Sequence, residues 1–157
     1  HLDSPGHILA NGKTISDFPL NSFMGRFIKV GKENYKKIKE VPESFSGVIY
    51  DTGWSQYFND SNKYFSSYRP SIPRDLINFC IENNINKFGC DLPSVDKSGS
   101  KDKPVHKAFL GNDIIIYESL NNLKALPMLK GFDFYGFPLS LSKLDASPVR
   151  AVAVLNQ

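Results

Sequence analysis

Two of the three histidines in this chain lie within its first seven residues, together with a carboxylate. His1 and Asp3 are two positions apart, so an extended backbone places both side chains on one face, with Cα atoms about 6 to 7 Å apart. That separation suits two ligands of one metal ion. Six residues of straight strand would carry His7 roughly 20 Å away. Pro5-Gly6 predicts a tight turn in which glycine accepts a positive φ, and such a turn would return His7 to the metal.

The third histidine, His106, lies far downstream and is followed by Glu118. Pro104 opens a predicted short helix that carries His106, and residues 114–117 are too apolar for anything but a buried strand. Glu118 comes directly after that strand, where a carboxylate must be solvated, paired or bound to a metal, because an isolated buried charge is costly. A helix that returns antiparallel onto the strand would place His106 beside Glu118. The alternative for the N-terminal cluster alone is an exposed strand and turn, or the remnant of an affinity tag.

Apolar runs and turn residues predict an α/β domain with more strand than helix. We expect strands at 26–30, 47–51, 86–91, 114–117, 132–142 and 149–155, and helices at 32–40, 72–84, 104–110 and 121–126. A strand, a helix and a second strand from 47 to 91 indicate a parallel, right-handed crossover. Residues 96–103 form a polar loop, the one segment that we expect to be mobile.

Composition describes an ordinary globular protein. Of its 157 residues, 41% are hydrophobic and 22% are charged. A chain of this length is expected to form one domain, over residues 1–157. A net charge of +3, with lysines scattered among acids, does not indicate nucleic-acid binding. No apolar run approaches the roughly 20 residues that span a bilayer, so we expect no membrane partner.

Cys80 and Cys90 are expected to be free buried thiols, which favours a reducing, cytoplasmic location.

An aromatic-rich segment follows the predicted strand at 47–51. Trp54, the only tryptophan, lies where this strand leaves the sheet, a common place for ligand contacts. Five further aromatic residues follow it: Tyr57, Phe58, Tyr64, Phe65 and Tyr68. The segment either lines a pocket for a flat substrate, with Trp54 in contact with it, or packs onto the domain surface.

Several motifs in a fixed order carry a resemblance over essentially the whole chain. They are His1, Asp3, Pro5 and His7; Asp51-Thr52-Gly53-Trp54-Ser55; Gly89-Cys90-Asp91-Leu92-Pro93-Ser94; Ser100-Lys101-Asp102-Lys103-Pro104-Val105-His106; and Ser147-Pro148-Val149-Arg150-Ala151-Val152-Ala153. The chain resembles the kynurenine formamidase and cyclase family of metal-dependent hydrolases, which includes isatin hydrolases. The family pattern is H-x-G-T-H-x-D-x-P-x-H, of which this chain supplies the second half. We therefore expect that the sequence lacks an N-terminal portion of the domain.

The resemblance implies a role for each residue of the two clusters. His1 would bind a first metal, with Asp3 bridging or binding beside it, and His7 would be the catalytic acid/base. His106 would bind a second metal, and Glu118 would be shared between the two. These nitrogen and oxygen donors suit a divalent metal, Zn or Mn, as one or two ions per chain. The implied fold is a swivelling β/β/α domain, a mixed sheet with flanking helices, assembled as a homodimer or larger.

The implied activity is hydrolysis of an amide C–N bond by a metal-activated water. The substrate would be a small aryl formamide such as N-formylkynurenine, or a cyclic amide such as isatin. A histidine with an ordinary pKa near 6.5 suits the proton transfers that His7 would perform. Two alternatives stay open: a hydrolase or cyclase of the same fold that acts on a lactone or another substrate, and a binding protein with a decayed site. The second rests on the absence of the pattern's first histidine.

Overall fold

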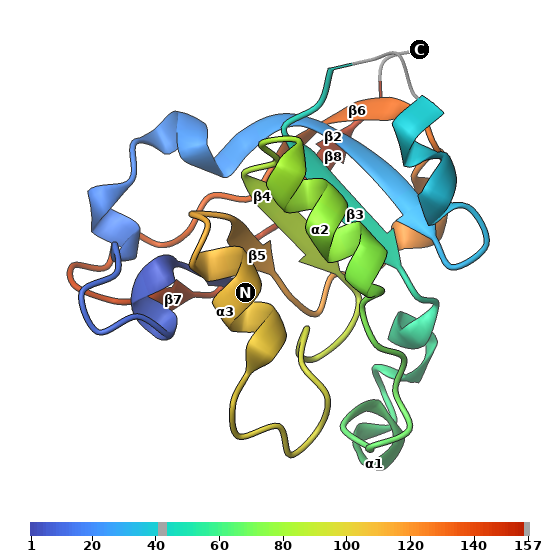
Figure 1. The fold of residues 1–157 in the computed structure, drawn as a ribbon, viewed down its shortest axis with the longest axis horizontal. Helices are drawn as coiled ribbons and strands as arrows, with labels where there is room; N and C mark the ends of the chain where they lie inside the picture. Colours follow the sequence, from blue (N-terminus) through green and yellow to red (C-terminus); the bar gives the residue numbers. More distant parts are fainter. Residues whose placement is uncertain (41–43, 156–157) are drawn as a thin grey trace.

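The computed structural model describes residues 1–40 and 44–155, and its strands form one eight-stranded mixed sheet (Figure 1). The strand order is β7-β1-β5-β4-β3-β2-β6-β8. The strands are β1 (Leu2–Asp3), β2 (Met24–Gly31), β3 (Gly47–Asp51), β4 (Lys87–Cys90), β5 (Ile115–Tyr117), β6 (Gly131–Tyr135), β7 (Ala146–Ser147) and β8 (Val152–Val154). The four central strands are parallel to one another, and all outer pairings are antiparallel. The predicted α/β class with a mixed sheet is confirmed.

Few helices accompany this sheet. The α-helices are α1 (Ser61–Tyr64), α2 (Arg74–Glu82) and α3 (Pro104–Leu110), and short 3₁₀ helices span Pro5–His7, Ile15–Asp17, Leu20–Phe23, Tyr35–Glu40, Trp54–Tyr57 and Leu123–Ala125. Figure 1 shows α2 and α3 side by side over the central strands. The parallel crossover predicted between 47 and 91 therefore appears as β3, α2 and β4, and its right-handedness stays a prediction.

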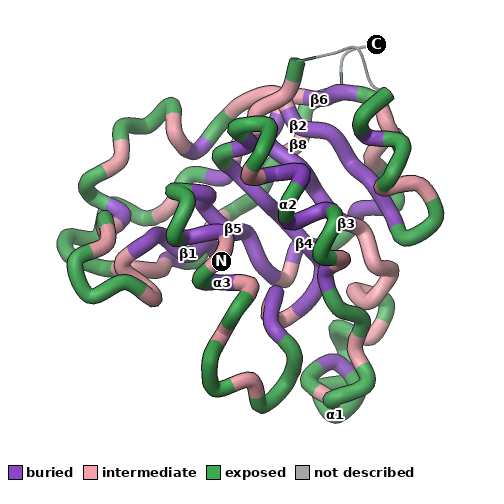
Figure 2. Tube along the Cα trace, in the orientation of Figure 1, coloured by how far each residue is buried: buried purple, intermediate pink, exposed green. Residues whose placement is uncertain are grey.

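The central strands are buried on both faces, as the purple tube in Figure 2 shows. In β3, Val48 and Tyr50 belong to the apolar cluster under the helices, whereas Ile49 belongs to the cluster on the opposite face. A strand covered on both sides needs apolar side chains at every position, which explains its continuous apolar run. The sheet thus lies between two apolar cores, one on each face.

The central elements were predicted well and the C-terminal ones less well. Expected strands at 26–30, 47–51, 86–91 and 114–117 correspond to β2 to β5. The strand predicted at 132–142 is wrong beyond Tyr135, because Pro138 has no N–H to donate and the chain leaves β6 at Gly136. A Cβ on Gly136 would lie 2.5 Å from the Tyr117 ring, so this crossing needs glycine. The helices predicted at 32–40 and 121–126 are shorter 3₁₀ segments.

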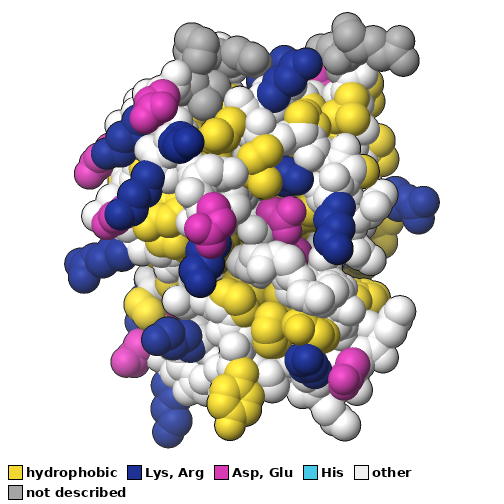
Figure 3. Space-filling model, turned by 90° about the vertical axis from the view of Figure 1, so that its right-hand side faces the viewer, with side chains coloured by type: hydrophobic (Ala, Val, Ile, Leu, Met, Phe, Trp, Pro, Cys, Tyr) yellow, Lys and Arg dark blue, Asp and Glu magenta, His cyan; other side chains and the backbone are white. Residues whose placement is uncertain are grey.

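Both cysteines are buried and free, as predicted. Burial raises the pKa of Cys80 to about 12, which keeps its thiol protonated and unreactive. No helix in the described ranges is long and apolar enough to cross a membrane. On the face drawn in Figure 3, basic and acidic side chains are interspersed among exposed hydrophobic ones.

Candidate metal centre and active site

Strand β1 brings the N-terminus beside the end of β5. Leu2 pairs antiparallel with Tyr117, and the backbone N–H of Glu118 donates to the His1 carbonyl at 3.1 Å. The side chains of His1 and Asp3 leave the strand on the same face, with His1 Nε2 3.9 Å from Asp3 Oδ1. His1 Nε2 also lies 3.3 Å from Glu118 Oε2. The shared face predicted from the spacing of His1 and Asp3 is confirmed.

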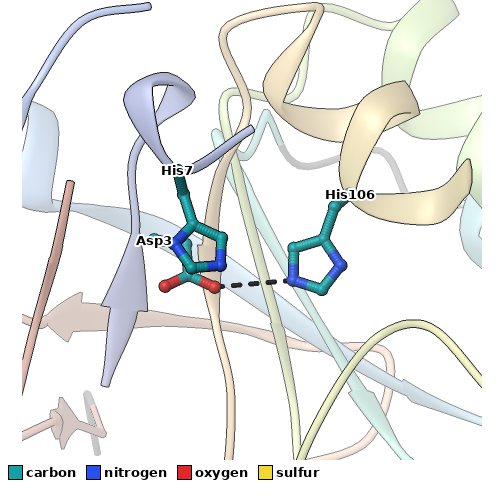
Figure 4. A group of neighbouring side chains, drawn as sticks. All are labelled: Asp3, His7 and His106. Atoms are coloured by element: carbon teal, nitrogen blue, oxygen red, sulfur yellow. Dashed lines mark ion pairs between the residues drawn. The ribbon is translucent and has the colours of Figure 1, made fainter. Parts of the chain in front are cut away.

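Helix α3 supplies the second imidazole from above the sheet. His106 is 2% exposed, and its Nε2 lies 3.5 Å from Asp3 Oδ2 and 3.4 Å from Glu118 Oε1. The helix therefore returns onto β5 and brings His106 to Glu118, as expected. Figure 4 shows the contact between His106 and Asp3 as a dashed line.

Each of the two carboxylates faces both imidazoles. Asp3 presents Oδ1 to His1 and Oδ2 to His106, and Glu118 presents Oε2 to His1 and Oε1 to His106. One ligand atom from each of His1, Asp3 and Glu118 lies within 4.8 Å of the others, and the same holds for Asp3, His7 and His106. The two groups share Asp3, an arrangement that fits two neighbouring ions.

His7, the last residue of the 3₁₀ helix Pro5–His7, is the fifth member of the cluster. Its ring centroid is 5.8 Å from that of His106, and Figure 4 shows both rings beside Asp3. Its Nδ1 lies 2.7 Å from Asp145 Oδ2, in the loop before β7. The turn returns His7 to the other residues as expected, so four elements converge on one site.

The predicted backbone of this turn is wrong. Gly6 is not among the described glycines with positive φ, which are Gly25, Gly53 and Gly99. A Cβ on Gly6 would lie 3.2 Å from each of two carbonyl oxygens, those of Gly12 and Lys13. Glycine here permits the close approach of residues 12 and 13, and helical rather than left-handed geometry reverses the chain.

The charges at the site favour a cation. Asp3, Asp96 and Glu118 are at most 5% exposed, and carboxylates so buried need positive partners. A hydrogen bond with Glu118 raises the pKa of His1. Burial by itself lowers the pKa of His106, but hydrogen bonds with Asp3 and Asp96 outweigh it and raise this pKa to about 9. The carboxylates thus favour positive charge on the imidazoles, and a divalent ion at this position would replace protons on them.

Sequence reasoning missed Asp96. Its Oδ2 lies 2.6 Å from Nδ1 of His106, and its carboxylate also accepts the backbone N–H groups of Val105 and His106. A carboxylate on Nδ1 fixes the tautomer and leaves Nε2 for the metal. The backbone N–H of Val95 similarly donates to Glu118 Oε1 at 2.7 Å. Asp96 opens the loop that was expected to be mobile, and no spacing in the sequence links it to His106.

Replacing Asp96 by asparagine is expected to weaken metal binding about 10- to 100-fold, because the partner that orients His106 loses its charge. Competition titration of Zn²⁺ against a chromophoric chelator measures the change. Asp102→Asn, on an exposed residue of the same loop, is the matched control. Equal affinities for the Asp96 variant and the unsubstituted protein would contradict this role.

The structure does not bring Trp54 to His1. The Trp54 indole N–H donates to the Tyr64 carbonyl at 3.0 Å, and its ring packs edge-on against Tyr57. A cavity of about 380 Å³ opens instead beside His1 and Glu118, with mainly apolar walls that include Ile49, Leu120, Leu123, Phe134 and Val149. Trp54 does not line this cavity, and its contact with substrate stays a prediction.

A cluster of imidazoles and largely buried carboxylates at the end of a mixed sheet forms a candidate metal centre in a protein of the α/β class. The chain belongs to the putative cyclase family, whose model matches residues 1–97. It is 34% identical over 157 residues to an uncharacterized protein of Methanocaldococcus jannaschii, covering 99% of this chain and 76% of that protein. It is 30% identical over 160 residues to kynurenine formamidase of Salinibacter ruber, covering 97% and 73%.

Solved structures share the fold. An isatin hydrolase bound to the product analogue thioisatinate superposes with a TM-score of 0.81 at 20% identity, over 99% of this chain and 71% of that one. A potential metal-dependent hydrolase with cyclase activity gives a TM-score of 0.78 at 23% identity, over 97% and 75%. The resemblance inferred from the motifs is therefore confirmed at the level of family and fold.

Proposed function

We propose that the protein is a metal-dependent hydrolase that cleaves the C–N bond of an aryl amide. The observation that carries this proposal is the pair of carboxylates, Asp3 and Glu118, each facing both His1 and His106, with His7 beside them. Relatives named kynurenine formamidase and a structural neighbour named isatin hydrolase support it. Both names denote cleavage of a carbonyl carbon from an aryl nitrogen.

The donors fit Zn²⁺ or Mn²⁺, one or two ions per chain. His1, Asp3 and Glu118 would hold one ion, and His106 would hold a second with the same two carboxylates. When bound, such an ion acts as a Lewis acid on a carbonyl oxygen and lowers the pKa of a water molecule. The buried carboxylates neutralise the ion, while Asp96 and the Val95 N–H keep His106 and Glu118 oriented.

His7 is suited to move the proton. With Asp145 accepting from Nδ1, the lone pair of the His7 ring is on Nε2. This nitrogen can take the proton of the attacking water and pass it to the departing amine, so that amide and water become a carboxylic acid and an amine. An aryl amine leaves more readily than an alkyl amine, which agrees with an aryl amide as substrate.

The cavity beside His1 is where we place the aromatic ring of the substrate. Its volume of about 380 Å³ is within the range typical of small-molecule sites, and apolar side chains form most of its wall. Hydrolysis of N-formylkynurenine, isatin and an aryl lactone by Zn- or Mn-loaded protein tests the assignment. We expect an amide or the lactam to give the highest kcat/KM. A clear preference for the lactone would favour the alternative substrate class, and no turnover at full metal occupancy would favour a decayed site.

Replacing Asp145 by asparagine is expected to lower kcat about 10²-fold while metal content and KM stay unchanged, because the amide no longer holds the His7 tautomer. Steady-state kinetics and elemental analysis separate the two effects. Asp133→Asn is the control, since Asp133 is similarly exposed but pairs with Arg26 away from the site. An unchanged kcat for the Asp145 variant would refute its positioning role.

We also propose that the protein assembles as a homodimer or larger. Phe65 and Tyr68 are 62% and 90% exposed, so one chain leaves aromatic surface uncovered. Light scattering of the purified protein measures the assembly directly, and a single mass equal to the chain mass would contradict it.

A further inference from the structure

A buried lysine, Lys87, lies at the end of the sheet opposite to the candidate metal centre. Lys87 is the first residue of β4 and pairs with Ile115, whereas the metal cluster lies beyond the other ends of β4 and β5. Ile115, the partner of Lys87, precedes Glu118 by three residues, which corresponds to about 10 Å along the strand. The side chain is 3% exposed although it carries an ammonium group. Lysine is rarely so buried without a partner.

The contacts of Lys87 leave its charge unbalanced. Its Nζ donates to Asn86 Oδ1 at 2.6 Å, and among the described residues it forms no ion pair with an acid. The other buried lysine, Lys29, differs, because its Nζ lies 3.6 Å from Asp51 Oδ2 and also donates to the Leu123 carbonyl. Burial lowers the pKa of Lys87 to about 8, as expected for an ammonium without a counter-charge.

Lys87 also lines a cavity of about 320 Å³. Asn21 and Ser22 line the same space from the segment that precedes β2, and Asn86 lines it beside Lys87. Among the described residues of the lining, Asp113 is the one acid, but it is exposed and pairs with Lys13 at 3.3 Å. Three residues with amide or hydroxyl side chains therefore line a cavity beside a buried positive charge.

We propose that this cavity binds a small oxyanion, a carboxylate or a phosphate, with the Lys87 ammonium as its counter-charge. An ammonium has three N–H donors, and only one is used by Asn86. Asn21, Ser22 and Asn86 line the same cavity, and their amide and hydroxyl groups would serve as neutral donors to the anion. A bound anion balances the buried charge, whose isolation in the interior is otherwise unfavourable. This site is independent of the hydrolase proposal.

Titration of the whole protein with sodium acetate and, separately, sodium phosphate tests the site. Ionic strength is held constant with sodium chloride, and amide resonances of Asn21, Ser22 and Asn86 are followed by NMR. A chelator-treated sample keeps metal-bound anions out of the readout. We expect saturable shifts at these three residues with at least one of the anions. The stronger of the two responses distinguishes a carboxylate from a phosphate ligand.

Lys87→Met is expected to weaken anion binding at least 10-fold, whereas Lys97→Met, on an exposed lysine, leaves it unchanged. If Lys87→Met does not fold, the double variant Asn21→Ala/Ser22→Ala retains the ammonium and is expected to weaken binding at least 3-fold. The proposal is overturned if neither anion gives saturable shifts in the unsubstituted protein. It is also overturned if the folded Lys87 variant, or in its place the double variant, binds as the unsubstituted protein does.

Discussion

Replacing Glu118 by glutamine is expected to reduce amide turnover at least about 10³-fold, or ~4 kcal/mol of transition-state stabilisation. Glu118 is 3% exposed and lies 3.3 Å from His1 and 3.4 Å from His106, so it faces both halves of the cluster. An amide has one oxygen and no charge, and it cannot face both imidazoles as an acceptor. The same variant is expected to lose bound metal.

Elemental analysis and steady-state kinetics on the same preparation measure both effects. Glu82→Gln, at the exposed end of α2, is the control that removes a carboxylate without touching the site. A Glu118 variant that keeps its metal and its rate would exclude Glu118 from the centre.

Replacing His7 by alanine is expected to lower turnover by about 10²- to 10⁴-fold and to leave the metal content unchanged, because His7 is assigned to proton transfer. The position of His7 means that this variant distinguishes proton transfer from metal binding. Ligand atoms of Asp3, His7 and His106 lie within 4.8 Å of one another, so His7 is also close enough to bind an ion. Loss of metal together with activity would make His7 a ligand.

His106→Ala is the matched comparison, since its imidazole is buried among three carboxylates and is expected to be needed for metal binding. The two histidine variants should therefore differ in metal content while both lose activity. A His7 variant as fast as the unsubstituted protein would remove the acid/base role.

The positions of the candidate ligands could be predicted because local geometry determines their placement. His1 and Asp3 share a face at a spacing of two, and a single helix-to-strand return brings His106 to Glu118. Asp96 and Asp145 could not be found in this way. Their contacts come from loops whose paths depend on the packing of other elements, and Asp145 lies 138 positions after His7.

The same distinction holds for the fold. Continuous apolar runs identified β2 to β5, since strands buried on both faces have an unambiguous composition. Strands β1 and β7 have two residues each, too few for any periodicity, and they exist because β1 pairs with β5 and β7 pairs with β1 at the sheet edge. Gly6 was misread because glycine serves two needs, positive φ and close approach, which the sequence does not distinguish.

Metal-dependent cleavage of an aryl amide is tested most directly by removing and restoring the metal. The purified protein is stripped with a chelator and reloaded with increasing Zn²⁺ or Mn²⁺, and the hydrolysis of N-formylkynurenine and isatin is measured at each occupancy. The expected result is loss of activity on stripping and a return in proportion to bound metal, up to one or two ions per chain. Equal hydrolysis by the stripped protein, or no hydrolysis of either amide by the fully loaded protein, would contradict the assignment.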